Sequence, residues 1–140
     1  MSDRYFLDTN IFVYSFDSTA TAKARKAQEL IANALATGKG VVSYQVVQEF
    51  LNVALRRFSV PMNVADAERY LASVFRPLLS VQSSAALFAQ ALLIFGHGKF
   101  SWYDSLIITS AIQANCDVLY SEDMQRGQKI GSLRIVNPFL

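Results

Sequence analysis

The residues best suited to chemistry in this sequence are four acids, each near the start or the end of an expected element. They are Asp8, Glu49, Asp104 and Asp123. Asp8 and Asp123 directly follow apolar runs that we expect to be strands, whereas Glu49 and Asp104 fall near the beginnings of expected helices. In an open parallel sheet, ligands bind outside the carboxyl ends of the strands, where the following helices also begin. We therefore expect all four carboxylates at one edge of a sheet.

Carboxylates gathered in this way indicate a site for a hard divalent cation. Two carboxylates about 4 Å apart repel each other by about 4 kcal/mol at an effective dielectric constant of 20, so a cluster of three or four calls for a compensating cation. Ligands that are all oxygen suit Mg²⁺ or Mn²⁺ rather than zinc. Such an ion polarises a phosphate and lowers the pKa of a bound water until it becomes a nucleophile. The expected chemistry is metal-dependent attack on a phosphate.

Each acid also has a purely structural interpretation. Asp8 and Asp123 can cap the turn or helix that follows them, and Glu49 can be a half-exposed helix residue. Asp104 can complete a capping box with Ser101, in the pattern S-x-x-D. What favours a site is the convergence of all four acids, which depends on the expected arrangement of the strands.

The elements that must position these acids follow from apolar periodicity and from capping and turn residues. We expect strands at residues 4–7, 41–43, 78–81, 117–120 and 133–136. We expect helices at residues 11–16, from Thr19 or Thr21 to Gly38, at 45–58, at 64–75 after Asn63 as cap and before Pro77, from Ser83 to about Phe95, and from Ser101. Lys23 is expected on the solvated face of the second helix. Alternating strands and helices indicate a three-layer α/β/α domain with a central, mostly parallel sheet of four to five strands.

Composition restricts the class of protein. The 140 residues are expected to form one domain, residues 1–140, and a hydrophobic fraction of 52% is enough to cover both faces of a sheet. No apolar run approaches the roughly 18 residues of a membrane span, so we expect a soluble, cytoplasmic protein with no membrane partner. A single cysteine, Cys116, excludes an internal disulfide, and the single histidine, His97, argues against a metal site built from histidines. The net charge of +2 does not identify a partner.

Four short motifs occur in an order and spacing that span almost the whole chain. They are Leu7-Asp8-Thr9-Asn10, Gln48-Glu49-Phe50, Trp102-Tyr103-Asp104-Ser105 and Tyr120-Ser121-Glu122-Asp123-Met124. Together they resemble a PIN-domain ribonuclease, above all the VapC-type toxins of bacterial toxin–antitoxin pairs. The first and the last motif are fairly specific, whereas the glutamate alone is not.

The resemblance implies a PIN-like fold and a metal-dependent endoribonuclease that uses Mg²⁺ or Mn²⁺. It implies that the four acids, Asp8, Glu49, Asp104 and Asp123, bind metal and catalyse, with Thr9, Asn10 and Ser121 as supporting residues. It also implies a homodimer and a cognate antitoxin protein that covers the site. Lys99 and Arg126 are candidates for contact with RNA phosphate, although ordinary solvated side chains explain both equally well or better.

Other functions remain open at this point. An aspartate-based phosphatase of the haloacid dehalogenase type needs a second aspartate two positions after the first, where this chain has Asn10. A phospho-receiver domain needs an aspartate after its middle strand, which here ends at Val81-Gln82-Ser83. A non-catalytic PIN-like interaction domain, whose acidic pocket receives a basic peptide, is not excluded by the sequence.

The sequence also suggests how an antitoxin would inhibit. The helices expected at residues 11–16 and 45–58 carry several large apolar side chains, which can form a wall for a peptide tail. An empty site with four carboxylates attracts arginine, whose planar guanidinium pairs with carboxylates in a bidentate manner. We therefore expect an arginine of the tail to compete with the metal. Core or homodimer contacts are the alternative role for these apolar side chains.

Overall fold

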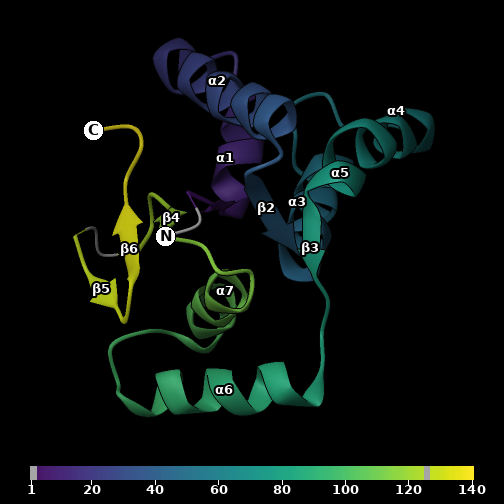
Figure 1. Cartoon of the computed structure of the whole chain (residues 1–140). Coiled ribbons are helices and arrows are strands. Elements are labelled where there is room, and N and C mark those ends of the chain that lie inside the picture. The colour runs from purple at the N-terminus through teal and green to yellow at the C-terminus, as the bar shows by residue number, and fades with distance from the viewer. Residues whose placement is uncertain (1–2, 125–126) are drawn as a thin grey trace.

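The computed structural model describes residues 3–124 and 127–140, which form one twisted sheet flanked by helices (Figure 1). The strands run in the order β3-β2-β1-β4-β6-β5. The four pairings from β3 to β6 are parallel, and β5 pairs antiparallel with β6. The strands are β1 (Tyr5–Leu7), β2 (Gly40–Ser43), β3 (Leu79–Val81), β4 (Val118–Tyr120), β5 (Lys129–Ile130) and β6 (Leu133–Val136). The expected α/β class with a mostly parallel sheet is confirmed.

The number of strands is higher than expected, because four to five were expected and the sheet has six. The additional strand is β5, which is only two residues long and forms a hairpin with β6. Gly131 lies in the turn of this hairpin at a φ of 61°, a conformation that glycine adopts without steric cost. A strand of two residues has no apolar alternation that periodicity could detect.

The helices are close to the expected ranges, with differences at their ends. They are α1 (Thr9–Tyr14), α2 (Thr21–Thr37), α3 (Tyr44–Arg56), α4 (Val64–Tyr70), the π-helical segment η1 (Leu71–Phe75), α5 (Arg76–Leu78), α6 (Ala85–Gly96) and α7 (Trp102–Gln113). Helix α1 begins two residues earlier than expected, with Asp8 as its N-cap. The cap of α6 is Ser84 rather than Ser83. Pro77, expected to follow a helix, instead lies at the start of the short helix α5, where a residue without an N–H is tolerated.

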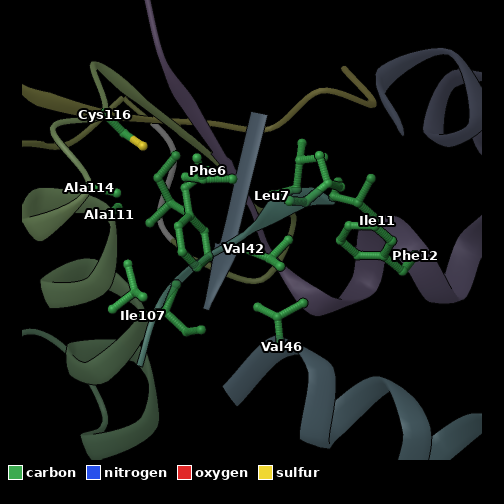
Figure 2. Packing of buried hydrophobic residues seen from close by; sticks show 14 of the residues in the cluster. Phe6, Leu7, Ile11, Phe12, Val42, Val46, Ile107, Ala111, Ala114 and Cys116 are labelled. Carbon is green, nitrogen blue, oxygen red and sulfur yellow. The ribbon is translucent and has the colours of Figure 1, made fainter. Parts of the chain in front are cut away.

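The core lies on both faces of the central strands, as alternation along a strand requires. Phe6 points toward Ile107 of α7, whereas Leu7 lies on the side of α1 and α3 (Figure 2). Both residues of β1 are fully buried. Burying a side chain of this size stabilises the fold by about 1.5–3 kcal/mol. Strand β1 is therefore held from both sides, and its carboxyl end has a fixed place.

An aromatic cluster joins α1 to α3 and to the continuous helix formed by α4, η1 and α5. The ring of Phe50 stacks on Tyr70 with centroids 5.0 Å apart, and Phe12 lies 4.9 Å from Phe75. Phe16 adds a partly exposed ring 5.4 Å from Phe58. These contacts fix α1 against α3, which carries Glu49.

Helix α2 packs closely on β2 at Gly40. A Cβ on Gly40 would lie 2.2 Å from the Cβ of Ala34 and 3.1 Å from the ring of Tyr5. The close approach of helix and strand therefore requires glycine at this position. Within the described residues, no helix is long and apolar enough to cross a membrane.

Candidate acidic active site

Asp8 lies at the junction of β1 and α1, and both of its carboxylate oxygens accept hydrogen bonds. Oδ1 accepts from the backbone N–H of Thr9 at 2.7 Å, and Oδ2 accepts from Oγ of Ser121 at 2.8 Å. Burial is the main cause that raises the pKa of Asp8 to about 6, and the nearby carboxylates of Glu49 and Asp104 contribute to the same rise. The two hydrogen bonds lower the pKa but do not offset the burial. The surroundings of Asp8 thus disfavour the ionised form of its carboxyl group.

The segment after β4 is held at three successive residues. Ser121 is buried and donates to Asp8. Glu122 accepts from the hydroxyl of Tyr14 at 2.9 Å and from the ammonium of Lys23 at 2.8 Å. The side chain of Asp123 accepts from the amide of Asn10. Lys23, expected on the solvated face of α2, has a side chain that is 41% exposed, and its ammonium also pairs with Glu122.

Glu49 reaches the same edge from α3. Oε1 of Glu49 accepts from Oγ1 of Thr9 at 2.9 Å, so the residue after Asp8 orients this second carboxylate. Thr9 is buried, whereas Glu49 is exposed. The carboxylate of Glu49 is close enough to Asp8 to raise the pKa of Asp8.

Asp104 reaches the edge from the first turn of α7. Its backbone N–H donates to Oγ of the N-cap Ser101 at 3.1 Å, as the S-x-x-D pattern predicts. Burial, followed by the charge of Asp123, raises the pKa of the Asp104 carboxyl, while Ser101 lowers it. The charge of Asp104 in turn raises the pKa of Asp8. Asp8 is thus within electrostatic range of Glu49 and Asp104, and Asp104 is within electrostatic range of Asp123.

The donors fit a hard divalent cation in their chemistry, since all four are carboxylates and two have raised pKa values. In the described part of the chain, however, no three acidic, histidine or cysteine side chains are arranged so that they surround one ion. Glu49 and Asp123 are exposed and turn toward Thr9 and Asn10.

Of the two candidates for RNA contact, only Lys99 lies within the described residues. Lys99 is exposed in the loop between α6 and α7. Arg126 lies outside the described residues. Sequence patterns had not singled out Tyr14, Lys23 or Gln45. Each of these acts across elements far apart in the chain, so no local motif marks it.

Two cavities adjoin the far end of α1 and share the side chains of Phe16, Phe58 and Val60. We call them together the Phe16 groove. Their volumes are about 430 and 490 Å³. Phe16 is 45% exposed and Val60 is 84% exposed, so the groove presents apolar surface to solvent. Asp17 and Arg57 line one cavity, and Asp66 and Arg69 line the other.

Comparisons with known proteins agree with this fold. The PIN domain family model matches residues 5–126. A search of the curated proteins finds no match. Among solved structures, a toxin–antitoxin complex from Klebsiella pneumoniae is 15% identical over 96% of this chain and 97% of that chain, with a TM-score of 0.64.

Two further solved structures have the same fold. VapC20 of Mycobacterium tuberculosis, a toxin that cleaves the sarcin–ricin loop, is 20% identical over 85% of this chain and 89% of that chain, with a TM-score of 0.57. FitAcB from Neisseria gonorrhoeae is 19% identical over 96% and 98% of the two chains, with a TM-score of 0.62. At these identities the likeness shows the fold.

Proposed function

This chain belongs to the PIN domain family, and from that premise we propose that it is a metal-dependent endoribonuclease, the toxin of a toxin–antitoxin pair. The observation that carries the proposal is the environment of Asp8. It is a buried carboxylate with a pKa raised to about 6, fixed by Thr9 and Ser121 beside two further acids. The described toxin neighbours support the assignment to a toxin–antitoxin pair.

The residues that would hold Mg²⁺ or Mn²⁺ are Asp8, Glu49, Asp104 and Asp123. When bound, such an ion supplies polarisation of a phosphate and a lowered pKa of water. Thr9 and Asn10 hold the carboxylates of Glu49 and Asp123 in the orientations found here. Ser121 fixes the second oxygen of Asp8 by a hydrogen bond from its hydroxyl. The chain thereby gathers acidic side chains at the end of the sheet.

The test is digestion of total RNA, with cleavage ends mapped by sequencing, in Mg²⁺, in Mn²⁺ and in excess EDTA. Asp8→Asn should abolish cleavage, whereas the matched control Asp66→Asn, an exposed acid paired with Arg69 on α4, should retain it. Undiminished cleavage in EDTA by nuclease-free preparations would show that the metal role is wrong. Absence of cleavage under every condition, together with binding of a basic peptide, would identify a non-catalytic interaction domain.

We further propose that the tail of an antitoxin lies in the Phe16 groove and reaches the acids along α1. From Asp8 to Phe16 a helix rises roughly 12 Å, which about four extended residues of a peptide can span. An apolar side chain in the groove and an arginine at the carboxylates are therefore compatible with one short tail. The arginine would compete with the metal for the same oxygens.

Inhibition by the protein encoded beside this one tests the antitoxin proposal. Raising Mg²⁺ should weaken inhibition, and Val60→Lys in the groove should weaken the complex while preserving cleavage. Inhibition that changes neither with the Mg²⁺ concentration nor on replacement of every arginine of the tail would show that the competition mechanism is wrong. It would not contradict the proposed nuclease activity.

For the homodimer we propose the outer face of α6 as the contact between copies. Helix α6 has no charged residue, and α7 separates it from the sheet (Figure 1). Phe88, Leu92 and Phe95 follow one another at the spacing of one helix face and are 40%, 58% and 46% exposed. An uncharged face can meet its own copy about a two-fold axis without repulsion. Light scattering should show a dimer for the wild type and for Val60→Lys, and a monomer for Leu92→Lys. A monomeric wild type would exclude the proposed dimer.

A further inference from the structure

A buried glutamine joins the first turns of the two helices that carry Glu49 and Asp104. Gln45, in the first turn of α3, is only 5% exposed. Its amide nitrogen Nε2 donates to the backbone carbonyl of Tyr103, in the first turn of α7, at 3.3 Å. The carbonyl of a helical residue has a second lone pair, so it can accept this bond in addition to the one within its own helix.

This amide is retained in the core although its burial is unfavourable. Within the described residues, Oε1 of Gln45 is buried and has no hydrogen-bond partner. Oγ of Ser43, at the end of β2 and wholly buried, also has none and does not cap α3. An unpaired buried polar atom is unfavourable for stability, so an unbranched apolar side chain at position 45 would favour stability. We therefore look for a role of this glutamine other than stability.

The position of the bond relative to the acids suggests that role. Gln45 and Glu49 are four residues apart on α3 and therefore share a face of the helix. Tyr103 immediately precedes Asp104. One hydrogen bond thus ties the turn below Glu49 to the residue before Asp104, and these two acids otherwise come from different layers of the domain.

We propose that Gln45 is a positioning residue, whose amide sets the distance between Glu49 and Asp104 and thereby the affinity of the site for a divalent cation. The inference rests on the proposed metal-dependent nuclease. It assigns to Gln45 no contact with RNA or with the ion. Loss of the amide should therefore weaken metal binding and turnover while leaving the affinity for RNA nearly unchanged.

The main variant is Gln45→Met, which keeps the length of the side chain and removes the donor. Its matched control is Gln28→Met, because Gln28 also donates its amide to a backbone carbonyl, that of Ser15 at 2.9 Å, but on the exposed side of α2. Gln45→Asn keeps the amide on a side chain that is too short to reach Tyr103. This variant is used if Gln45→Met does not fold. Mn²⁺ binding to RNA-free protein is measured by isothermal titration calorimetry, and kcat and KM are measured on a defined RNA.

The expected result for Gln45→Met is an unchanged or higher melting temperature in EDTA, a 10- to 100-fold weaker Kd for Mn²⁺ and a comparable loss in kcat, which is the usual effect of removing such an outer contact. KM for RNA should change less than about twofold, and Gln28→Met should resemble the wild type. A wild-type Kd for Mn²⁺ in Gln45→Met would overturn the positioning role while wild-type cleavage still supports the nuclease. A wild type that neither binds Mn²⁺ nor cleaves RNA would overturn the proposed function and, with it, this inference.

Discussion

Oγ of Ser121 donates to Oδ2 of Asp8 at 2.8 Å, and this bond connects residues that are 113 positions apart in the chain. It joins the carboxyl ends of β4 and β1, which are hydrogen-bonded neighbours in the sheet. The bond lowers the pKa of Asp8 against the larger effect of burial. Ser121 therefore favours the ionised form of Asp8, against the larger effect of burial.

Replacement of Ser121 should change the pH dependence of cleavage. Ser121→Ala removes a bond that favours the ionised form of Asp8, so the pKa of Asp8 should rise above about 6. The acidic limb of the rate profile should move to higher pH, and cleavage at pH 6.5 (about half a unit above that pKa) should fall more than cleavage at pH 8. The control is Ser110→Ala, since Ser110 is also buried but donates to Leu106 within α7. An acidic limb at the same pH in wild type and Ser121→Ala would contradict the predicted rise in the pKa of Asp8.

The metal-free protein should lose stability from Asp8 as the pH rises. The folded-state pKa of Asp8 is about 6, against an ordinary value of 3.8. The folded state therefore holds the proton more tightly, and this contribution is fully present below pH 3.8 and is lost as the pH rises through about 6. A shift of about two units corresponds to about 3 kcal/mol at pH 7.

Asp8→Asn isolates this contribution, because Asp17 and Glu122 have lowered pKa values and act in the opposite direction at low pH. In urea unfolding with EDTA, the difference in unfolding free energy between Asp8→Asn and wild type should grow in favour of the variant between pH 4 and pH 7 (the range of the shift). A large loss of stability in the variant at pH 7 would instead favour a helix-capping role for Asp8.

The pair of Lys23 and Glu122 should contribute little to stability but measurably to activity. The side chains are 41% and 22% exposed, so solvent screens the pair, and a double-mutant cycle of Lys23→Met and Glu122→Gln should give a coupling of about 0.2–1 kcal/mol that shrinks in salt. Glu122 lies between Ser121 and Asp123, so loosening it should reduce kcat severalfold. Lys26→Met, an exposed lysine on the same helix, is the control. Unchanged kcat in both single variants would show that the pair does not contribute to activity.

Gly40→Ala should destabilise the fold by about 1–3 kcal/mol, the usual cost of overpacking. Its Cβ would meet that of Ala34 at 2.2 Å. A second substitution, Ala34→Gly, removes the opposing atom and should restore part of the loss. Gly96→Ala serves as the control, since a Cβ there has no atom within 4 Å. Melting temperatures of the three variants and of the double variant test this, and an unaffected Gly40→Ala would show that α2 and β2 separate readily.

Local signals in the sequence predicted those elements whose ends carry their own chemistry. The pattern S-x-x-D placed the start of α7, and Ser101 does cap Asp104. Gly38 ends α2 in the left-handed conformation at a φ of 71°. Strand β6 occupies the expected residues 133–136. In each case a signal within a few neighbouring residues marks the element, so the sequence alone indicates it.

What the sequence did not reveal depends on contacts between distant segments. The pairing of Lys23 with Glu122 spans 99 positions, and the bond from Gln45 to Tyr103 spans 58. Strand β5 exists only because β6 offers it a partner. The choice of Ser84 over Ser83 as the cap of α6 depends on where the chain leaves β3. Such features are fixed by the packing of the whole domain rather than by a local pattern.

The order of the sheet also determines which part of the site survives local opening. Strands β1 and β4 lie in the interior of the sheet, each with a partner on both sides, whereas β3 and β5 form the edges. Amide protons of interior strands exchange with solvent only in large openings, while those at edges exchange through fraying. In deuterium exchange, Phe6 and Leu119 should therefore be among the slowest amides and Lys129 among the fastest. The backbone below Asp8 would then persist through fluctuations that transiently release the rim of the domain.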